Sequence, residues 1–116
     1  MSNTKEMFTY QQENRPEAVV VHLGGCVDCT QTNRLVELFQ ETREKADKDV
    51  IIELSDLTYI DSAGLGTLVA ERSRWVRKGL QFRLCSPIPA VNSVFRSSHL
   101  DRLFEIHPTL EAALKA

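Results

Sequence analysis

The sequence of 116 residues lacks the features that mark membrane-spanning, secreted and nucleic-acid-binding chains. No apolar run approaches the roughly 18 residues of a membrane span, and the amino terminus has no apolar signal-peptide core. Three cysteines, an odd number, argue against a disulfide framework. The net charge of −2 provides neither a basic field for nucleic acid nor a polybasic membrane patch. We therefore expect a cytoplasmic protein with no nucleic-acid partner and no direct membrane insertion.

The composition is that of one ordinary globular domain. Hydrophobic residues make up 42% of the chain and charged residues 26%. A chain of this length matches a typical domain of about 100–150 residues and buries about two thirds of its unfolded surface. No internal repeat, low-complexity segment or linker divides it. We expect a single domain over residues 1–116, with a short amino-terminal tail at about residues 1–6.

Apolar patterns of period two alternate along the chain with patterns of helical period. This alternation predicts an α/β fold, in which helices pack on a mixed β-sheet. Besides the stretch that begins at Val50, strands are expected at residues 7–12, at 18–23 (ended by Gly24-Gly25), at 80–85 and at 105–107. Helices are expected from an N-cap at Thr30 to about residue 45, at 90–96 after Pro89, and at 110–116 after Pro108-Thr109.

The most informative stretch spans residues 50–79. It begins with a β-branched run typical of a strand buried on both faces, and the period becomes helical after Ile60. Between the two lies Asp61-Ser62-Ala63-Gly64, at the kind of strand-to-helix junction where α/β proteins expose backbone N–H groups. The pattern therefore predicts that Ser62 presents a hydroxyl at the positive end of a helix, with a carboxylate beside it.

The residues alone leave two interpretations open for each position near this junction. Ser62 is either a helix N-cap or an exposed site of modification, and Asp61 and Asp28 are either cap and turn residues or part of a binding surface. Gly64 and Gly66 are unusual in a first helical turn. They indicate either close packing on the sheet or the approach of a partner's backbone.

A second motif, Cys26-Val27-Asp28-Cys29, has the C-x-x-C spacing of thiol redox sites. No Trp or Pro flanks the pair, and the carboxylate of Asp28 disfavours thiolate formation. A redox protein that uses Cys26 and Cys29 is therefore the less favoured hypothesis. Cys85 is interpreted as a small core residue, and Trp75 as either a core residue or an interface anchor.

Residues 57–66, Leu-Thr-Tyr-Ile-Asp-Ser-Ala-Gly-Leu-Gly, resemble the phosphorylation segment of the STAS domain family, and within it the stand-alone bacterial anti-sigma-factor antagonists. Gly25-Cys26-Val27-Asp28 and the proline-initiated helix near Pro89 agree in order and spacing, so that the resemblance covers residues 18–114. Two positions depart from the family pattern. Cys26 stands where the residue is often acidic or polar, and His99 stands where glycine is common.

The resemblance implies a partner-switching regulator that is not an enzyme and needs no cofactor. The unphosphorylated form would bind an anti-sigma factor with serine kinase activity and release a sigma factor. Phosphorylation of Ser62 would end that complex, and a PP2C-type phosphatase would reset it. The implied contact surface consists of Asp28, Cys29, Thr30, Asp61, Ser62, Gly64 and Leu65. A STAS module of a stressosome or of a lipid transporter is the alternative within the family.

Overall fold

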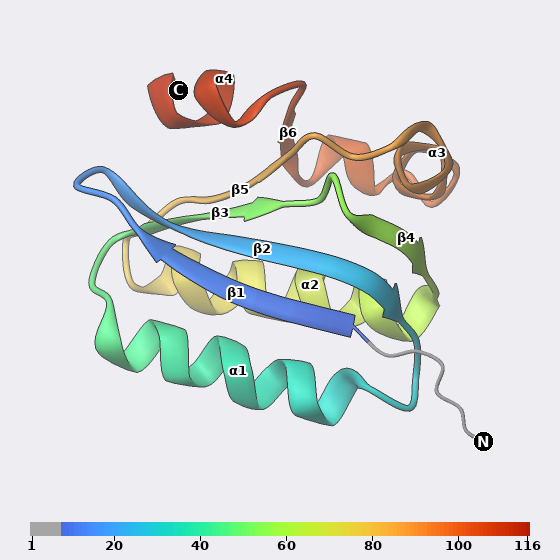
Figure 1. Cartoon of the computed structure of the whole chain (residues 1–116), viewed down its shortest axis with the longest axis horizontal. Coiled ribbons are helices and arrows are strands. Elements are labelled where there is room, and N and C mark those ends of the chain that lie inside the picture. Colours follow the sequence, from blue (N-terminus) through green and yellow to red (C-terminus); the bar gives the residue numbers. More distant parts are fainter. Residues whose placement is uncertain (1–7) are drawn as a thin grey trace.

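A computed structural model describes residues 8–116, so the expected tail at residues 1–6 and the first residue of the first expected strand lie outside the described part. In this part of the chain, six strands form one mixed sheet (Figure 1). They are β1 (Phe8–Asn14), β2 (Ala18–Val27), β3 (Asp49–Glu53), β4 (Leu57–Ile60), β5 (Phe82–Cys85) and β6 (Glu105–His107). The order is β1-β2-β3-β5-β6, with β4 also paired to β2; β1 is antiparallel and the other pairs are parallel.

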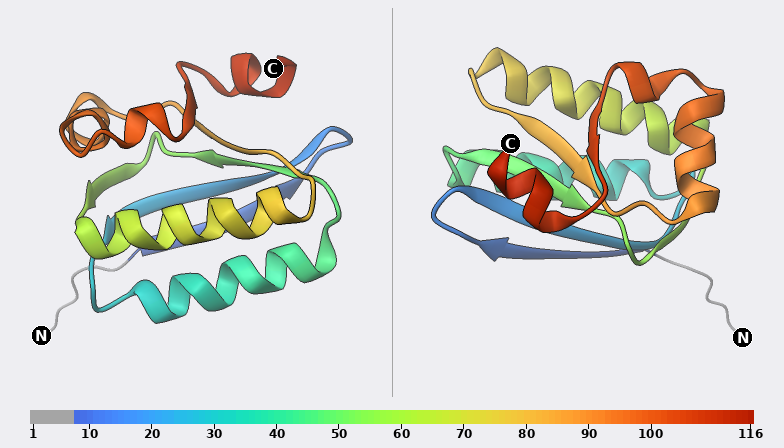
Figure 2. Two further views of the ribbon diagram at one scale, coloured as in Figure 1. Left: turned by 180° about the vertical axis from the view of Figure 1, so that it is seen from behind. Right: turned by 90° about the horizontal axis from the view of Figure 1, so that it is seen from above.

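The helices are α1 (Thr32–Lys45), α2 (Ser62–Arg77), α3 (Pro89–Ser97) and α4 (Leu110–Lys115), with a 3₁₀ turn, η1, at Leu100–Arg102. Figures 1 and 2 show α1 and α2 packed on one face of the sheet, while α3 and α4 lie on the other side. The predicted α/β fold, a mixed sheet with helices packed on it, is confirmed. The main core lies between the sheet and the first pair of helices, where Phe39 and Trp75 are completely buried. Trp75 is thus a core residue, and its interpretation as an interface anchor is wrong.

The predicted end of the second strand at Gly24-Gly25 is also wrong, because β2 continues through both glycines to Val27. The first part of β2 pairs with β3, and the last part pairs with β4 after a register shift between Gly25 and Cys26. Gly25 has a φ of +82°, a conformation that favours glycine. The glycines therefore redirect the strand toward a new neighbour instead of ending it.

The stretch that begins at Val50 forms two strands, separated by a turn in which the amide of Leu57 donates to the carbonyl of Leu54 (3.0 Å). The predicted N-cap at Thr30 is displaced as well, since α1 begins at Thr32 and Gln31 is its N-cap. The hydroxyl of Thr30 instead donates to the Asp28 carboxylate (2.6 Å). The remaining predicted elements are present, with ends that differ by one or two residues.

A buried carboxylate joins the two helices under the sheet. Glu71 of α2 is completely buried and accepts hydrogen bonds from Arg43 of α1 and from Arg74 one turn further along α2 (2.7 Å). Lys78, after the end of α2, donates to the backbone carbonyl of Arg43 (3.3 Å). These contacts fix the position of α2 relative to α1, and with it the position of the junction at Ser62.

Removing this carboxylate is expected to destabilise the fold. In Glu71→Ala, Arg43 loses its buried partner, and the free energy of unfolding should fall by about 3–5 kcal/mol. Arg74, which is 41% exposed, serves as the comparison, because Arg74→Ala leaves the Arg43–Glu71 pair in place and should cost only about 1–3 kcal/mol. Urea denaturation measures both values. Equal losses in the two variants would show that the buried pair has no special role.

Candidate functional site

The candidate site lies where two adjacent parallel strands end. Val27 of β2 and Ile60 of β4 are register partners, and Asp28 and Asp61 follow them directly. The carboxyl ends of strands are the usual position of binding sites in open α/β sheets. The bend in β2 thus brings together two acidic residues that the sequence places in separate motifs.

Asp61 is the N-cap of α2 and uses both of its carboxylate oxygens. Oδ1 accepts from the backbone N–H of Gly64 (2.9 Å), and Oδ2 accepts from the backbone N–H of Cys29 (3.2 Å). The first bond satisfies a helix amide that has no partner within the helix. The second ties the turn of residues 28–31 to the start of α2. The interpretation of Asp61 as a cap is therefore confirmed.

Asp28 stabilises the same turn through hydrogen bonds to the residues that follow it. Its Oδ1 accepts from the backbone N–H of Thr30 (2.9 Å) and from the Thr30 hydroxyl, while the amide of Gln31 donates to the Asp28 carbonyl (3.0 Å). Cys29 and Thr30 are exposed at the tip of this turn. The result is a short, well-bonded loop that presents two side chains beside the start of α2.

Ser62 is the first residue of α2, and its side chain is exposed. Since Asp61 provides the cap, the hydroxyl of Ser62 is not used for that purpose, and its interpretation as the N-cap is wrong. Tyr59, which lies on β4 three residues before Ser62 in the sequence, is 52% exposed. Sequence reasoning missed Tyr59 because an aromatic residue in an apolar strand is ordinarily expected to be buried.

The two glycines of α2 have different surroundings. A Cβ on Gly64 would lie 2.7 Å from Cγ1 of Ile60 and 2.9 Å from the carbonyl oxygen of Val27, so close packing on the sheet explains this glycine. A Cβ on Gly66 would meet no atom within 4 Å, and packing within the chain does not explain that residue. Gly64 and Leu65 are buried and add little accessible surface to the predicted contact region, whereas Gly66 is exposed.

The cysteines are free thiols in three different environments. Cys26 is half-buried with its Sγ 3.9 Å from the Thr58 hydroxyl oxygen, and Cys29 is exposed. Cys85 is buried, which raises its pKa to about 11 and confirms its role as a core residue. Within residues 8–116, no group of three His, Cys, Asp or Glu side chains is arranged to hold a metal ion. No helix in this part of the chain is long and apolar enough to cross a membrane.

Comparison with known proteins identifies the fold and its relatives. Residues 9–113 match the family model of the STAS domain. The anti-sigma-F factor antagonist RsfA of Mycobacterium tuberculosis is 24% identical over 90% of this chain and 83% of its own length. An anti-sigma factor antagonist from Mycobacterium paratuberculosis has a similar structure, with a TM-score of 0.84, 24% identity, and 94% and 92% of the two chains covered. The Bacillus cell fate determinant SpoIIAA in its phosphorylated form superimposes with a TM-score of 0.69, at 22% identity over 92% and 97% of the chains.

The different surroundings of the two glycines predict opposite effects of alanine. Gly64→Ala forces a Cβ against the Val27 backbone and should lower the free energy of unfolding by about 1–3 kcal/mol. In Gly66→Ala the new Cβ meets no other atom, and the higher helix propensity of alanine should raise the free energy of unfolding by up to about 1 kcal/mol. Chemical denaturation of the two variants measures the difference. Two destabilising effects of similar size would contradict the packing described here.

Proposed function

This chain belongs to the STAS domain family, and we propose that it is an anti-sigma factor antagonist whose binding is switched off by phosphorylation of Ser62. The observation that carries the proposal is the exposed Ser62 at the first position of α2, beside a helix cap that does not need its hydroxyl. Similarity to the antagonist RsfA supports the class of partner. A phosphorylated form exists among proteins of this fold, in SpoIIAA.

The proposed partner is an anti-sigma factor with serine kinase activity. The unphosphorylated chain binds it and a sigma factor is released; phosphorylation of Ser62 then ends the complex, and a PP2C-type phosphatase restores the hydroxyl. In this cycle the chain supplies the acceptor oxygen, and the partner supplies ATP and the catalytic groups. Of the predicted contact surface, Ser62, Cys29 and Thr30 are exposed and Asp28 and Asp61 are half-buried; we add Gly66, which is exposed near the start of α2.

A phosphate on Ser62 would change the stability of the fold only slightly. It adds a charge of about −1.5 to −2 and three acceptor oxygens. The amino-terminal end of α2 favours a negative group by about 0.3–1 kcal/mol, while the adjacent Asp61 carboxylate opposes it. Because the two contributions are small and opposite in sign, the domain keeps its structure in both states.

The loss of binding must therefore arise at the interface. Shifting a complex from about 99:1 to 1:99 requires about 5.5 kcal/mol of differential binding. A phosphate dianion that is desolvated against a surface built for a neutral hydroxyl can supply several kcal/mol of that penalty. The switch in this scheme depends on charge at one position of an otherwise unchanged face.

Phosphorylation at one site is the direct test. After incubation with ATP and a soluble extract of the host, the wild-type chain should gain one phosphoryl group in intact-mass analysis, and Ser62→Ala should gain none. The double variant Cys26→Ser, Cys29→Ser should be phosphorylated like the wild type, since the thiols have no part in the cycle. An unmodified wild type, or equal modification of Ser62→Ala, would refute the proposal.

A further inference from the structure

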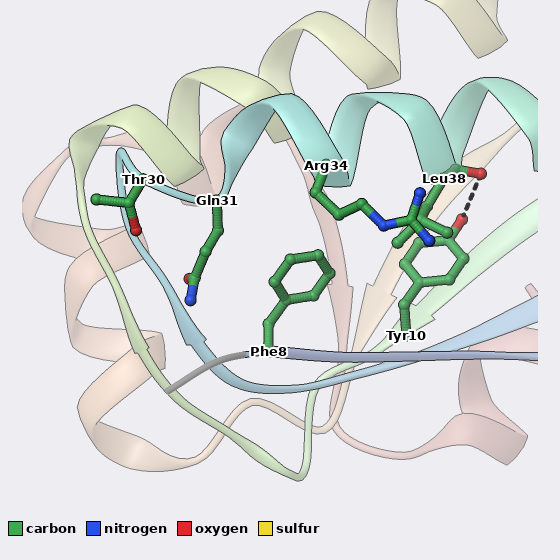
Figure 3. A pocket seen from close by; sticks show the side chains of 6 residues that line it. All are labelled: Phe8, Tyr10, Thr30, Gln31, Arg34 and Leu38. Carbon is green, nitrogen blue, oxygen red and sulfur yellow. Dashed lines mark hydrogen bonds between the residues drawn. The ribbon is translucent and has the colours of Figure 1, made fainter. Parts of the chain in front are cut away.

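A pocket of about 440 Å³ lies between β1 and the amino-terminal half of α1, next to the turn of residues 28–31. Figure 3 shows the six residues that line it: Phe8, Tyr10, Thr30, Gln31, Arg34 and Leu38. Its volume falls within the range of about 300–1,000 Å³ that is usual for binding pockets. The phosphorylation cycle described above gives this pocket no role.

One side of the pocket is apolar and rigid. The rings of Phe8 and Tyr10 project from β1 toward α1 (Figure 3). The Tyr10 hydroxyl contacts the Thr42 hydroxyl (2.7 Å) and donates to the Leu38 carbonyl (3.4 Å), and its ring packs edge-on against Phe39 at 5.4 Å. The polar group of Tyr10 is therefore occupied, and its ring offers a fixed apolar surface. Such a surface suits an aliphatic or aromatic group.

The charge of the pocket comes from Arg34. Its side chain extends toward Leu38 and Tyr10 (Figure 3), and none of the lining residues within the described range 8–116 is an acid. Arg34 contacts Glu37 at 3.2 Å, but both side chains are largely exposed, at 60% and 65%. An exposed ion pair of this kind contributes little, so the guanidinium can pair with another carboxylate. The pocket is complementary to an apolar group with a carboxylate close by.

The pocket shares a structural element with the candidate site. Thr30 and Gln31 line it, and both belong to the turn that Asp61 holds through the amide of Cys29. Asp61 is adjacent to Ser62 in the chain. A partner that covers Ser62 and the tip of this turn therefore has the pocket directly beside its contact area.

Building on the proposed function, we propose that this pocket receives an apolar side chain of the anti-sigma factor, and that Arg34 pairs with a carboxylate of the same segment. The pocket then acts as an anchor beside the switch. Phosphorylation of Ser62 dissociates the complex, while the pocket determines which anti-sigma factor binds. Selection by a desolvated apolar anchor together with one charge pair is common in protein interfaces.

A pair of small probes tests the chemistry of the pocket without the partner. In amide NMR titrations at millimolar concentration, phenylacetate should shift the signals of Phe8, Tyr10 and Arg34, and benzylamine, which carries the opposite charge, should shift them far less. Arg34→Glu should reverse this preference. Arg102→Glu, at an exposed arginine of η1, makes the same change in net charge and should leave the preference for phenylacetate intact.

The proposal is overturned if both probes cause equal shifts or if neither causes any. It is also overturned if removal of residues 1–7 enhances the phenylacetate shifts, because the chain's own amino terminus would then be the occupant.

The rate of Ser62 phosphorylation tests whether the partner kinase binds through this pocket. At limiting kinase, Arg34→Glu should slow the reaction by about tenfold or more, whereas Arg102→Glu should leave it unchanged. If the wild type is phosphorylated and Arg34→Glu reacts equally fast, the anchor is refuted while the proposed function stands. If the wild type is never phosphorylated, the proposed function fails, and the assignment of the pocket to an anti-sigma factor fails with it. The probe titrations then still decide whether the pocket has the proposed chemistry.

Discussion

The two hydrogen bonds accepted by the Asp61 carboxylate are the constraint on which the candidate site depends. One caps α2 through the amide of Gly64, and the other holds the turn before α1 through the amide of Cys29. Because Asp61 satisfies the helix end, the next residue, Ser62, can keep its hydroxyl exposed at the positive end of α2. A single carboxylate thus separates the structural task of capping from the proposed task of carrying a phosphate.

The rest of the fold brings that carboxylate to its place. β2 bends at Gly25 and moves from β3 to β4, so that the ends of two strands from distant parts of the sequence lie side by side. Gly64 lets α2 pack closely on those ends, and buried Glu71 ties α2 to α1 through Arg43. A site held by close packing and by hydrogen bonds from several elements can take up a charge without rearranging. This rigidity is why the proposed switch acts on binding and not on folding.

Much of the fold could be predicted because the local spacing of apolar residues indicates its helices and strands, as the helical spacing after Ile60 indicates α2. The rest depends on tertiary contacts that spacing does not contain. Glycines in a strand signal either an end or a bend, and only the pairing of β2 with β4 distinguishes the two. Adjacent Asp61 and Ser62 are both good N-caps, and only the structure shows that Asp61 takes this role, with its other carboxylate oxygen on the Cys29 amide. Likewise Gly64 and Gly66 look alike in the sequence, yet the first is packed on the sheet and the second faces open space.

The most direct measurement compares Ser62→Asp with the wild type, by amide NMR of the free protein and by affinity for the anti-sigma factor that phosphorylates Ser62. The account predicts amide shifts confined to residues 28–31 and 61–66, an unchanged free energy of unfolding, and loss of binding. Wild-type affinity in Ser62→Asp would contradict it, as would shifts that spread through the sheet.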